Sequence, residues 1–385
     1  MTPTRQLFVL QAFLFVGCAS WSGCANADAP LGGESAALPG QTSPVFALAF
    51  SADGKLLATG GAPWEPWEQV RKVPNPFARS GQLYIWDWRT KGKVIARSDV
   101  DSPLAIPQYP FMSIVFSPDG KSLIAAGTGT QGVLREIEMT CYYYVHDVPD
   151  GVQAQCGTRG RIKENEFFFK RKINRVWQLA ISPDGRSLAY CSTKETVVID
   201  ENYDDIGDRK FLNGPAGVAT CLSYAPDGKS IATGGGPDKA VKLLNVTPGK
   251  EITEVAALKH DAVVSWVGFT KDGQTLAATD DSGVLKLWDV AQRKERHTIQ
   301  AHPGDIGALA VSPDGKVAAT GGDKAIKLWD LSTGKELKSL PNQKGRIQAL
   351  AFSPDGKILA SSACDVSKEG EVRMWDVAKL LEGKP

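Results

Sequence analysis

The sequence predicts an all-β protein built from seven copies of one small antiparallel sheet. Three observations indicate this: a turn motif centred on Asp-Gly recurs seven times, short apolar runs flank each copy, and the later copies are evenly spaced. Because Pro presets φ and Gly tolerates positive φ, such turns join neighbouring antiparallel strands. A meander of four strands cannot bury both of its faces alone, so we expect the copies to stack on one another.

The segment at residues 306–340 shows the repeating unit most clearly. Turn residues divide it into four runs, and the predicted strands span residues 306–311, 317–320, 325–329 and 335–340. The turns between these strands contain Pro313-Asp314-Gly315, Gly321-Gly322-Asp323 and Ser332-Thr333-Gly334. One copy is therefore predicted to be a four-stranded antiparallel meander.

The turn after each first strand gives the number of copies. These turns lie at residues 51–54, 117–120, 182–185, 225–228, 270–273, 312–315 and 353–356. The last four copies are lean, whereas the first three carry insertions. We therefore expect seven sheets, with the extra residues concentrated in the first three.

The predicted third strand ends in Trp-Asp in four of the seven copies, at Trp86-Asp87, Trp288-Asp289, Trp329-Asp330 and Trp375-Asp376. With these pairs, residues 34–376 resemble the WD40 repeat family. The resemblance implies a seven-bladed β-propeller, whose four-stranded antiparallel blades surround a channel. It also implies a buried hydrogen-bonded set in each repeat, and repeat six matches every position of that set with His302, Thr320, Asp323 and Trp329.

Other repeats depart from this set in defined ways. Repeat five keeps His260 and Trp288 and moves the acidic residue to Asp280 or Asp281. Repeats two, three and four lack the Trp. We expect apolar packing to hold those three blades together.

The two ends of the repeat region predict how the ring closes. After Asp376 only nine residues follow, VAKLLEGKP, so the seventh blade lacks an outer strand of its own. A short segment of suitable composition, residues 34–38, precedes the first inner strand at residues 45–50. We expect this N-terminal segment to complete the last blade and to remove an exposed sheet edge.

The first residues are typical of an export signal. Arg5 is followed by an apolar run at residues 7–17 and by the small-residue site Ala25-Asn26-Ala27. This arrangement predicts a signal peptide at residues 1–27, a short tether at 28–33 and the propeller at 34–385. Cys18 resembles the lipid-attachment cysteine of bacterial lipoproteins, which would end the signal just before it. We expect a periplasmic or extracellular protein, attached to a membrane only through such a lipid.

Four long segments are predicted to emerge on one face of the ring. Residues 62–79 and 128–139 lie between the second and third strands of blades one and two, and residues 99–110 and 156–172 join consecutive blades. In a meander of this kind, these two types of connection leave the sheet on the same side. Long loops in compact repeats are often functional, so this face is the predicted recognition surface.

Aromatic and basic side chains dominate two of these segments. They are the residue types that dominate binding hot spots. An alternative interpretation is that the aromatic side chains fold back and plug the channel mouth. The candidate binding residues are Trp64, Trp67, Arg71, Lys72, Phe77, Arg79, Arg159, Arg161, Phe167, Phe168, Phe169, Lys170, Arg171 and Lys172.

The cysteines permit two interpretations. Cys141 and Cys156 would face each other across a hairpin centred near residue 148, which suits a disulfide in an exported protein. The alternative is a pair of buried thiols. Cys191, Cys221 and Cys364 are most simply small core residues.

Motifs that would indicate catalysis are weak. Residues 127–132 read G-x-G-x-x-G, but a hairpin strand follows where a dinucleotide site needs a βαβ unit. Only four His residues are present and two have structural roles, so we expect no metal site. The charges nearly cancel, 44 basic against 43 acidic, and no nucleic-acid partner is expected.

The predicted function is therefore that of a non-catalytic scaffold. WD40 resemblance implies scaffolding, and the partner would be a protein or peptide of unknown identity, bound by a monomer without a cofactor. Two alternatives remain. One is an exported propeller enzyme, similar to a lactonase or hydrolase, acting at the channel mouth; the other is binding of an anionic glycan or nucleic acid by the basic segment at residues 156–172.

Overall fold

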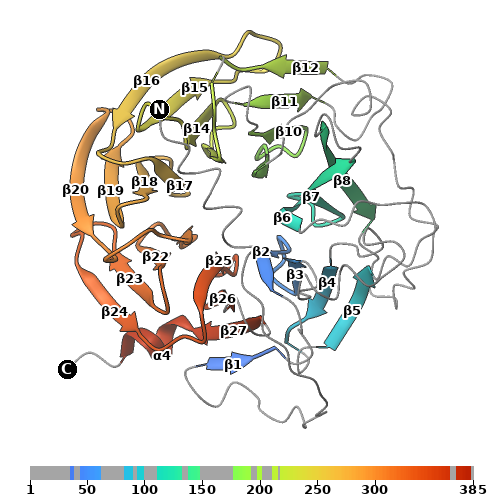
Figure 1. Cartoon of the computed structure of the whole chain (residues 1–385), viewed down its shortest axis with the longest axis vertical. Helices are drawn as coiled ribbons and strands as arrows, with labels where there is room; N and C mark the ends of the chain where they lie inside the picture. Colours follow the sequence, from blue (N-terminus) through green and yellow to red (C-terminus); the bar gives the residue numbers. More distant parts are fainter. Residues whose placement is uncertain are drawn as a thin grey trace.

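Antiparallel sheets arranged in a ring make up the molecule (Figure 1). The computed structural model describes residues 35–38, 44–61, 82–89, 93–98, 111–131, 138–147, 177–191, 197–201, 210–215, 217–364 and 370–382. Within these ranges the strands form six four-stranded sheets and one three-stranded sheet. The ring confirms an all-β propeller, and six of its blades have the four strands that the repeat predicts.

We number the blades in chain order, each from its inner to its outer strand. Blade one contains β2 (Val45–Phe50), β3 (Leu56–Gly61), β4 (Gln82–Asp87) and β5 (Lys93–Ser98). Blade two contains the three described strands β6 (Phe111–Phe116), β7 (Ser122–Gln131) and β8 (Glu138–Asp147). Blade three contains β9 (Leu179–Ile181), β10 (Ser187–Tyr190), β11 (Val198–Glu201) and β12 (Lys210–Asn213).

The remaining blades are the lean ones. Blade four contains β13 (Cys221–Tyr224), β14 (Ser230–Gly234), β15 (Ala240–Asn245) and β16 (Thr253–Lys259). Blade five contains β17 (Val264–Phe269), β18 (Thr275–Asp280), β19 (Val284–Asp289) and β20 (Lys294–Gln300). Blade six contains β21 (Ala308–Val311), β22 (Val317–Gly321), β23 (Ile326–Asp330) and β24 (Glu336–Leu340). Blade seven contains β25 (Arg346–Phe352), β26 (Ile358–Cys364), β27 (Glu371–Asp376) and β1 (Ser35–Ala37).

The recurring turn after each inner strand is held by its own side chains. In blade six the Ser312 hydroxyl donates to Asp314 Oδ1 at 2.6 Å, and the same oxygen accepts the backbone N–H of Lys316 at 3.1 Å. Gly315 follows with φ of 70°, a conformation that a side chain would strain. These bonds satisfy the turn locally, which is why the motif can recur from blade to blade.

Neighbouring blades pack closely because a glycine ends several second strands. A Cβ atom added to Gly321 would lie 2.3 Å from Cγ2 of Ile347 in the next blade, and one added to Gly234 would lie 2.4 Å from Cγ1 of Val264. Both apolar side chains are buried in the clusters between blades. The glycines therefore make room for the core that joins one sheet to the next.

The N-terminal segment completes blade seven, as predicted. Strand β1 pairs antiparallel with β27, with Ser35 opposite Trp375 and Ala37 opposite Arg373. The Leu38 N–H continues the ladder by donating to the Val372 carbonyl at 2.9 Å. Figure 1 shows β1 beside β27, so chain segments from opposite ends of the sequence close the ring.

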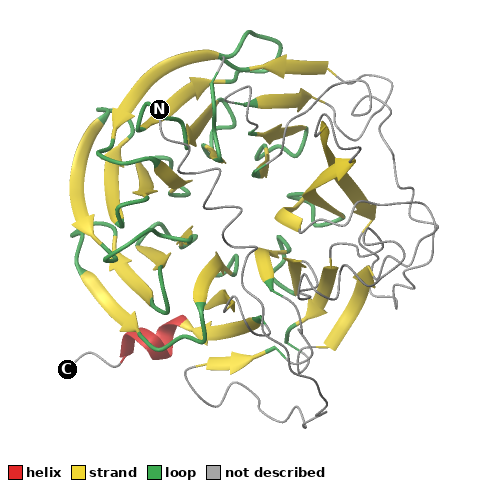
Figure 2. Ribbon diagram, viewed as in Figure 1, coloured by secondary structure: helices red, strands yellow, loops and turns green. Residues whose placement is uncertain are grey.

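A short helix, α4 (Val377–Glu382), follows the last strand and is drawn red in Figure 2. It buries Val377 and Leu380 in the cluster between blades six and seven. Within the described ranges, no helix is long and apolar enough to cross a membrane.

One predicted insertion is wrong in part. Residues 128–139 were expected to form a loop in blade two, but β7 continues to Gln131 and β8 begins at Glu138. Thr128 pairs with Cys141 and Gln131 with Glu138 in a regular antiparallel register. The glycine-rich motif beginning at Gly127 therefore lies mostly within a strand of a hairpin, a context unlike that of a dinucleotide site.

Candidate interaction face

Two types of connection share one side of the ring in the lean blades. The His260 N–H, which leads out of blade four, donates to the Lys239 carbonyl in the turn between β14 and β15 at 2.8 Å. The Ala301 N–H donates in the same way to the Gly283 carbonyl at 2.9 Å. We call this side the connection face: it carries the turns between second and third strands and the connections between blades. These bonds confirm, for blades four and five, the geometry on which the sequence prediction rests.

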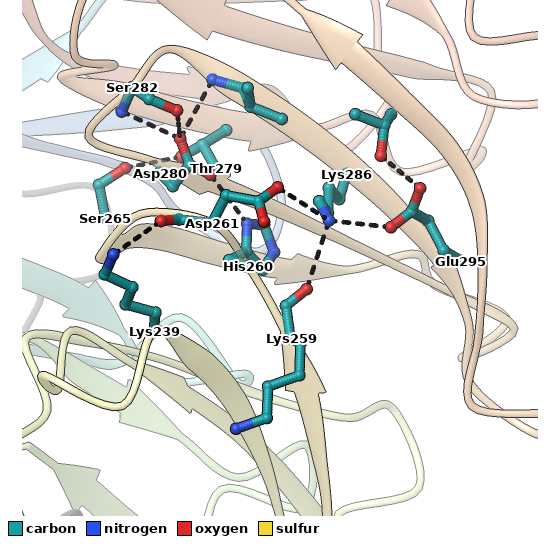
Figure 3. Close-up of polar contacts among 12 residues, drawn as sticks. Lys239, Lys259, His260, Asp261, Ser265, Thr279, Asp280, Ser282, Lys286 and Glu295 are labelled. Carbon is teal, nitrogen blue, oxygen red and sulfur yellow. Dashed lines mark hydrogen bonds and ion pairs between the residues drawn. The ribbon is translucent and has the colours of Figure 1, made fainter.

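Blade five carries a polar cluster on the connection face (Figure 3). The imidazole of His260 donates from Nδ1 to Asp280 Oδ2 at 3.1 Å, and both side chains are almost completely buried. His260 belongs to the connection from blade four, whereas Asp280 is the last residue of β18. Their bond therefore ties two blades together beneath the face.

Asp280 also organises the turn that follows it. Its Oδ1 accepts the backbone N–H and the hydroxyl of Ser282, at 3.0 and 2.6 Å, and the N–H of Val284 at 3.2 Å. Burial raises the pKa of the Asp280 carboxyl, but the hydrogen bonds that it accepts outweigh this effect, so the pKa lies below its usual range. The side chain is thus an ionised anchor for the turn.

Lys286 links the outer part of the same cluster through its ammonium group. Its ammonium lies 2.9 Å from Glu295 Oε2, 3.4 Å from the Lys259 carbonyl and 3.8 Å from Asp261 Oδ2. It also lies 5.7 Å from the centre of the Trp288 ring, a cation–π distance. Because these groups satisfy one another, the cluster serves to hold two strands and a connection in place.

Two buried atoms of the cluster, His260 Nε2 and Trp288 Nε1, have no hydrogen-bond partner among the described residues. The Thr279 hydroxyl, which could serve them, is instead 2.9 Å from the Ser265 hydroxyl. The rings of His260 and Trp288 lie 6.0 Å apart. Blade five therefore uses a hydrogen bond from His260 to a buried carboxylate in place of a hydroxyl-centred set.

Blade six builds the hydroxyl-centred set. The Trp329 indole N–H donates to Thr320 Oγ1 at 2.8 Å, and His302 Nε2 lies 2.9 Å from the same oxygen. The hydroxyl oxygen accepts the indole N–H, and the imidazole tautomer sets the direction of its second hydrogen bond, with His302 Nε2. Burial lowers the pKa of His302 and the charge of Lys327 lowers it further, which agrees with a neutral imidazole.

Asp323 does not belong to this buried set, which corrects the sequence prediction. Its side chain is exposed, and within the described residues no hydrogen bond joins it to His302. β22 continues through Gly321, and Lys324 turns the chain with φ of 57°, so Asp323 projects from the tip of the turn. In blade five the acidic residue at the strand end, Asp280, is the one that is buried.

The Trp-hydroxyl bond recurs in blades one and seven, although within the described ranges it is absent at Trp288 of blade five. The Trp86 indole donates to Thr59 Oγ1 at 3.1 Å, and the Trp375 indole donates to Ser361 Oγ at 2.8 Å. In blade four Leu244 takes the Trp position and is fully buried in an apolar cluster, as predicted for that blade.

Sequence reasoning missed a second recurring feature on the outer strands. Lys286 pairs with Glu295 in blade five, and Lys327 pairs with Glu336 at 3.2 Å in blade six. The ammonium of Lys327 lies 5.5 Å from the Trp329 ring, as Lys286 lies over Trp288. The signal was present as a Lys two residues before each Trp and a Glu shortly after the following turn.

The predicted binding residues lie outside the described residues. This holds for the six candidates at residues 64–79 and the eight at residues 159–172, and also for Cys18 and Cys156. Cys141 lies on β8, opposite Thr128. Cys191, Cys221 and Cys364 are buried, which agrees with a core role. Across the described ranges, no group of His, Cys, Asp or Glu side chains could hold a metal ion.

Comparison with known proteins identifies the repeat. A family model described as "WD domain, G-beta repeat" matches residues 32–87, 209–245, 253–289, 293–330 and 334–376, which is more than half of the chain. The matches leave out residues 88–208, which contain β5, the described strands of blade two and the first three strands of blade three.

Individual relatives share only part of their length with this chain. The WD40 repeat protein poxJ of Penicillium oxalicum is 33% identical over 132 residues, 32% of this chain and 37% of that protein. The guanine nucleotide-binding protein subunit beta of Schizosaccharomyces pombe is 27% identical over 144 residues, 37% of this chain and 46% of the relative. The periodic tryptophan protein 2 homolog of Dictyostelium discoideum is 27% identical over 240 residues, 61% of this chain and 22% of the relative. The aligned part therefore spans less than half of each relative.

Proposed function

The chain belongs to the WD40 repeat family, and we propose that it is a non-catalytic scaffold that binds a protein or peptide through the connection face over blades one to three. One observation carries this proposal: in blades four and five, bonds such as that from His260 N–H to the Lys239 carbonyl bring both types of connection to one side. Residues 62–79 lie between β3 and β4, and residues 99–110 lie between β5 and β6, so both segments belong to these types. The repeat pattern predicts the same for residues 156–172.

The contrast between the two halves of this face supports the proposal. In the lean half, Lys286 and its acidic partners satisfy one another, so little is left to recognise a partner. The insertions add aromatic and Arg residues to the other half, and these residue types dominate binding hot spots. One relative is named as a subunit of a guanine nucleotide-binding protein, which is an assembly.

A pull-down from the native host tests the proposal. The tagged full chain is compared with a variant that lacks residues 62–79 and with the triple variant Lys170→Ala, Arg171→Ala and Lys172→Ala. We expect both variants to lose the partner and to keep the thermal unfolding midpoint of the wild type. A partner retained by both variants would exclude this part of the face.

We further propose that the protein works outside the cytoplasm as a monomer of seven four-stranded blades. The basic start, apolar run and Ala25-Asn26-Ala27 site support cleavage after Ala27. The alternative is cleavage just before Cys18, with the lipid attached to that residue. N-terminal sequencing and intact mass of protein from the exported fraction test this. A chain that starts at Met1 with an unmodified Cys18 would reject export by this signal.

A further inference from the structure

Among the described residues of the inner strands, three large apolar side chains take no part in the core. Phe46 on β2, Met112 on β6 and Trp266 on β17 are each half-buried. None of them belongs to, or packs against, any of the seven apolar clusters between blades. Other inner-strand side chains of similar size, such as Phe50 and Phe269, do pack against these clusters. The exceptions therefore call for a role other than folding.

Two of these three side chains, Phe46 and Met112, lie at a β-bulge. In blade one, Val45 pairs with Gly61 and Ala47 with Gly60, so Phe46 has no opposite residue. In blade two, Met112 is skipped in the same way between Phe111 and Ser113. A bulge leaves its extra residue unpaired and turns the side chain away from the regular alternation.

Blade seven, the other neighbour of blade one, has the same bulge with a polar residue at the skipped position. In blade seven, Ile347 pairs with Ala363 and Ala349 with Ser362, so Gln348 is the skipped residue. Blades seven, one and two are consecutive around the ring. Gln348, Phe46 and Met112 are therefore presented side by side from equivalent positions of three neighbouring inner strands.

These positions lie at the connection-face end of the ring centre. Strands β2, β6, β17 and β25 are the innermost strands of their blades (Figure 1). Each starts at the connection face, and the bulged residue comes second or third in its strand. Blade five adds Trp266 from the opposite side of the ring, next to its own bulge at Ser265.

Two of these side chains offer unused hydrogen-bonding groups. Neither the Gln348 amide nor the Trp266 indole N–H has a hydrogen-bond partner in the described part of the chain. An amide can donate to and accept from one peptide group at the same time. An apolar pair beside a free amide thus has the chemistry to hold a peptide by one apolar side chain and its adjacent backbone.

We propose that Phe46, Met112 and Gln348 form the anchoring subsite for an extended peptide segment of the partner, which places one large apolar side chain against Phe46 and Met112. The inference rests on the proposed function, because the subsite extends the connection face of blades one and two toward the ring centre. It identifies the place on that face where the partner is anchored. Trp266 contacts the far side of the same segment. Large apolar side chains buried near the centre of an interface usually dominate its affinity.

A peptide selection on the full chain tests this. Phage-displayed random peptides are selected on the immobilised protein, and the selected peptides are then titrated by fluorescence polarisation. We expect the selected peptides to share a large apolar residue, and Phe46→Asp or Met112→Asp to weaken their binding about tenfold or more. Gln348→Ala should weaken it about threefold. Val255→Asp is the matched control, because Val255 is 41% exposed on the outer strand β16 and should not affect binding.

Several outcomes would overturn the subsite. Selection of no peptide, or peptides that bind Phe46→Asp and Gln348→Ala as tightly as the wild type, would do so. A wild-type dimer that Phe46→Asp converts to monomer would assign the patch to a second copy of the chain instead. If Phe46→Asp lowers the unfolding midpoint, Phe46→Ala and Gln348→Ala decide the matter.

Binding of the natural partner to two variants distinguishes this inference from the proposed function. A partner that is lost on deletion of residues 62–79 but retained by Phe46→Asp would leave the proposed function standing and reject the subsite. A partner retained by both variants would reject the recognition face itself.

Discussion

Blades five and six have nearly the same sequence pattern, yet they hold their centres by different chemistry. Blade five buries a hydrogen bond from the His260 imidazole to the Asp280 carboxylate, with the nearby Thr279 hydroxyl directed to Ser265. Blade six gathers Trp329 and His302 around the Thr320 hydroxyl and leaves its acidic residue in solvent. The position of one acid, at the strand end or at the turn tip, decides which arrangement forms. A repeat motif therefore specifies a fold more strictly than it specifies hydrogen bonds.

Removing the buried acid should have the largest effect. Asp280→Ala leaves the His260 imidazole and the backbone of the following turn without their acceptor, so we expect a loss of about 3 kcal/mol in the free energy of unfolding. Urea denaturation measures it. The matched control is Asp323→Ala in blade six, where an exposed carboxylate should contribute within about 0.5 kcal/mol. Equal losses for the two variants would show that the blades do not differ.

Removing the threonine hydroxyl should cost more stability in blade six than in blade five, which is the reverse of the effect of removing the acid. Thr320→Val leaves the Trp329 indole and His302 Nε2 unpaired in the core, and we expect a loss of about 2 kcal/mol. Thr279→Val removes only the bond to Ser265, for a loss of about 1 kcal/mol or less. Denaturation of both variants in one buffer checks this. A larger loss for Thr279→Val would mean that the threonine also serves His260 or Trp288.

Acid should weaken the two centres in separate pH ranges. The pKa values of His302 and Asp280 are both depressed by folding, so the stability each contributes is present above its unfolded value and is lost as pH falls toward the folded value. For His302 the loss begins below its ordinary value of 6.5, and for Asp280 below 3.8. We expect His302→Gln to flatten the upper part of the stability profile and Asp280→Asn the lower part. An unchanged upper part in His302→Gln would reject this assignment.

The smallest effect concerns the turns of the two blades. Blade six has Pro313 where blade five has Lys271, and Pro at this position restricts the unfolded chain. Lys271 is exposed and has an ordinary negative φ, so Lys271→Pro should stabilise the protein by about 0.4–1 kcal/mol. The shift of the thermal midpoint measures it. The reverse change, Pro313→Lys, is the control and should destabilise by a similar amount.

The sequence was sufficient to predict the architecture because the chemistry of the turns and the closure of the ring both indicate the same fold. Turns such as Ser312-Pro313-Asp314-Gly315 satisfy their own polar groups, so their recurrence identified the strands of blade six to within about two residues. The pairing of β1 with β27 followed from an incomplete last repeat. These features depend on neighbours in sequence or on the need to cover an edge.

Other features depend on distances that a sequence does not contain. Hairpin length in blade two is set by pairing of Thr128 with Cys141, so a Gly- and Thr-rich stretch that resembles a loop became strand. The burial of Asp280, and the exposure of Asp323, depend on where each strand ends. The bulges at Phe46 and Met112 arise from register between strands, and only the structure reveals them.

The pairing of β1 with β27 also sets an order of events during synthesis. Blade one emerges from the ribosome first, yet the apolar cluster that contains Leu57 and Trp86 is completed by Ile358 and Met374 of blade seven. That surface stays uncovered until nearly the whole chain has been translated, and exposed apolar surface of this kind invites aggregation. Completion of the polypeptide, and not the appearance of each blade, therefore determines when the first sheet is fully protected from water.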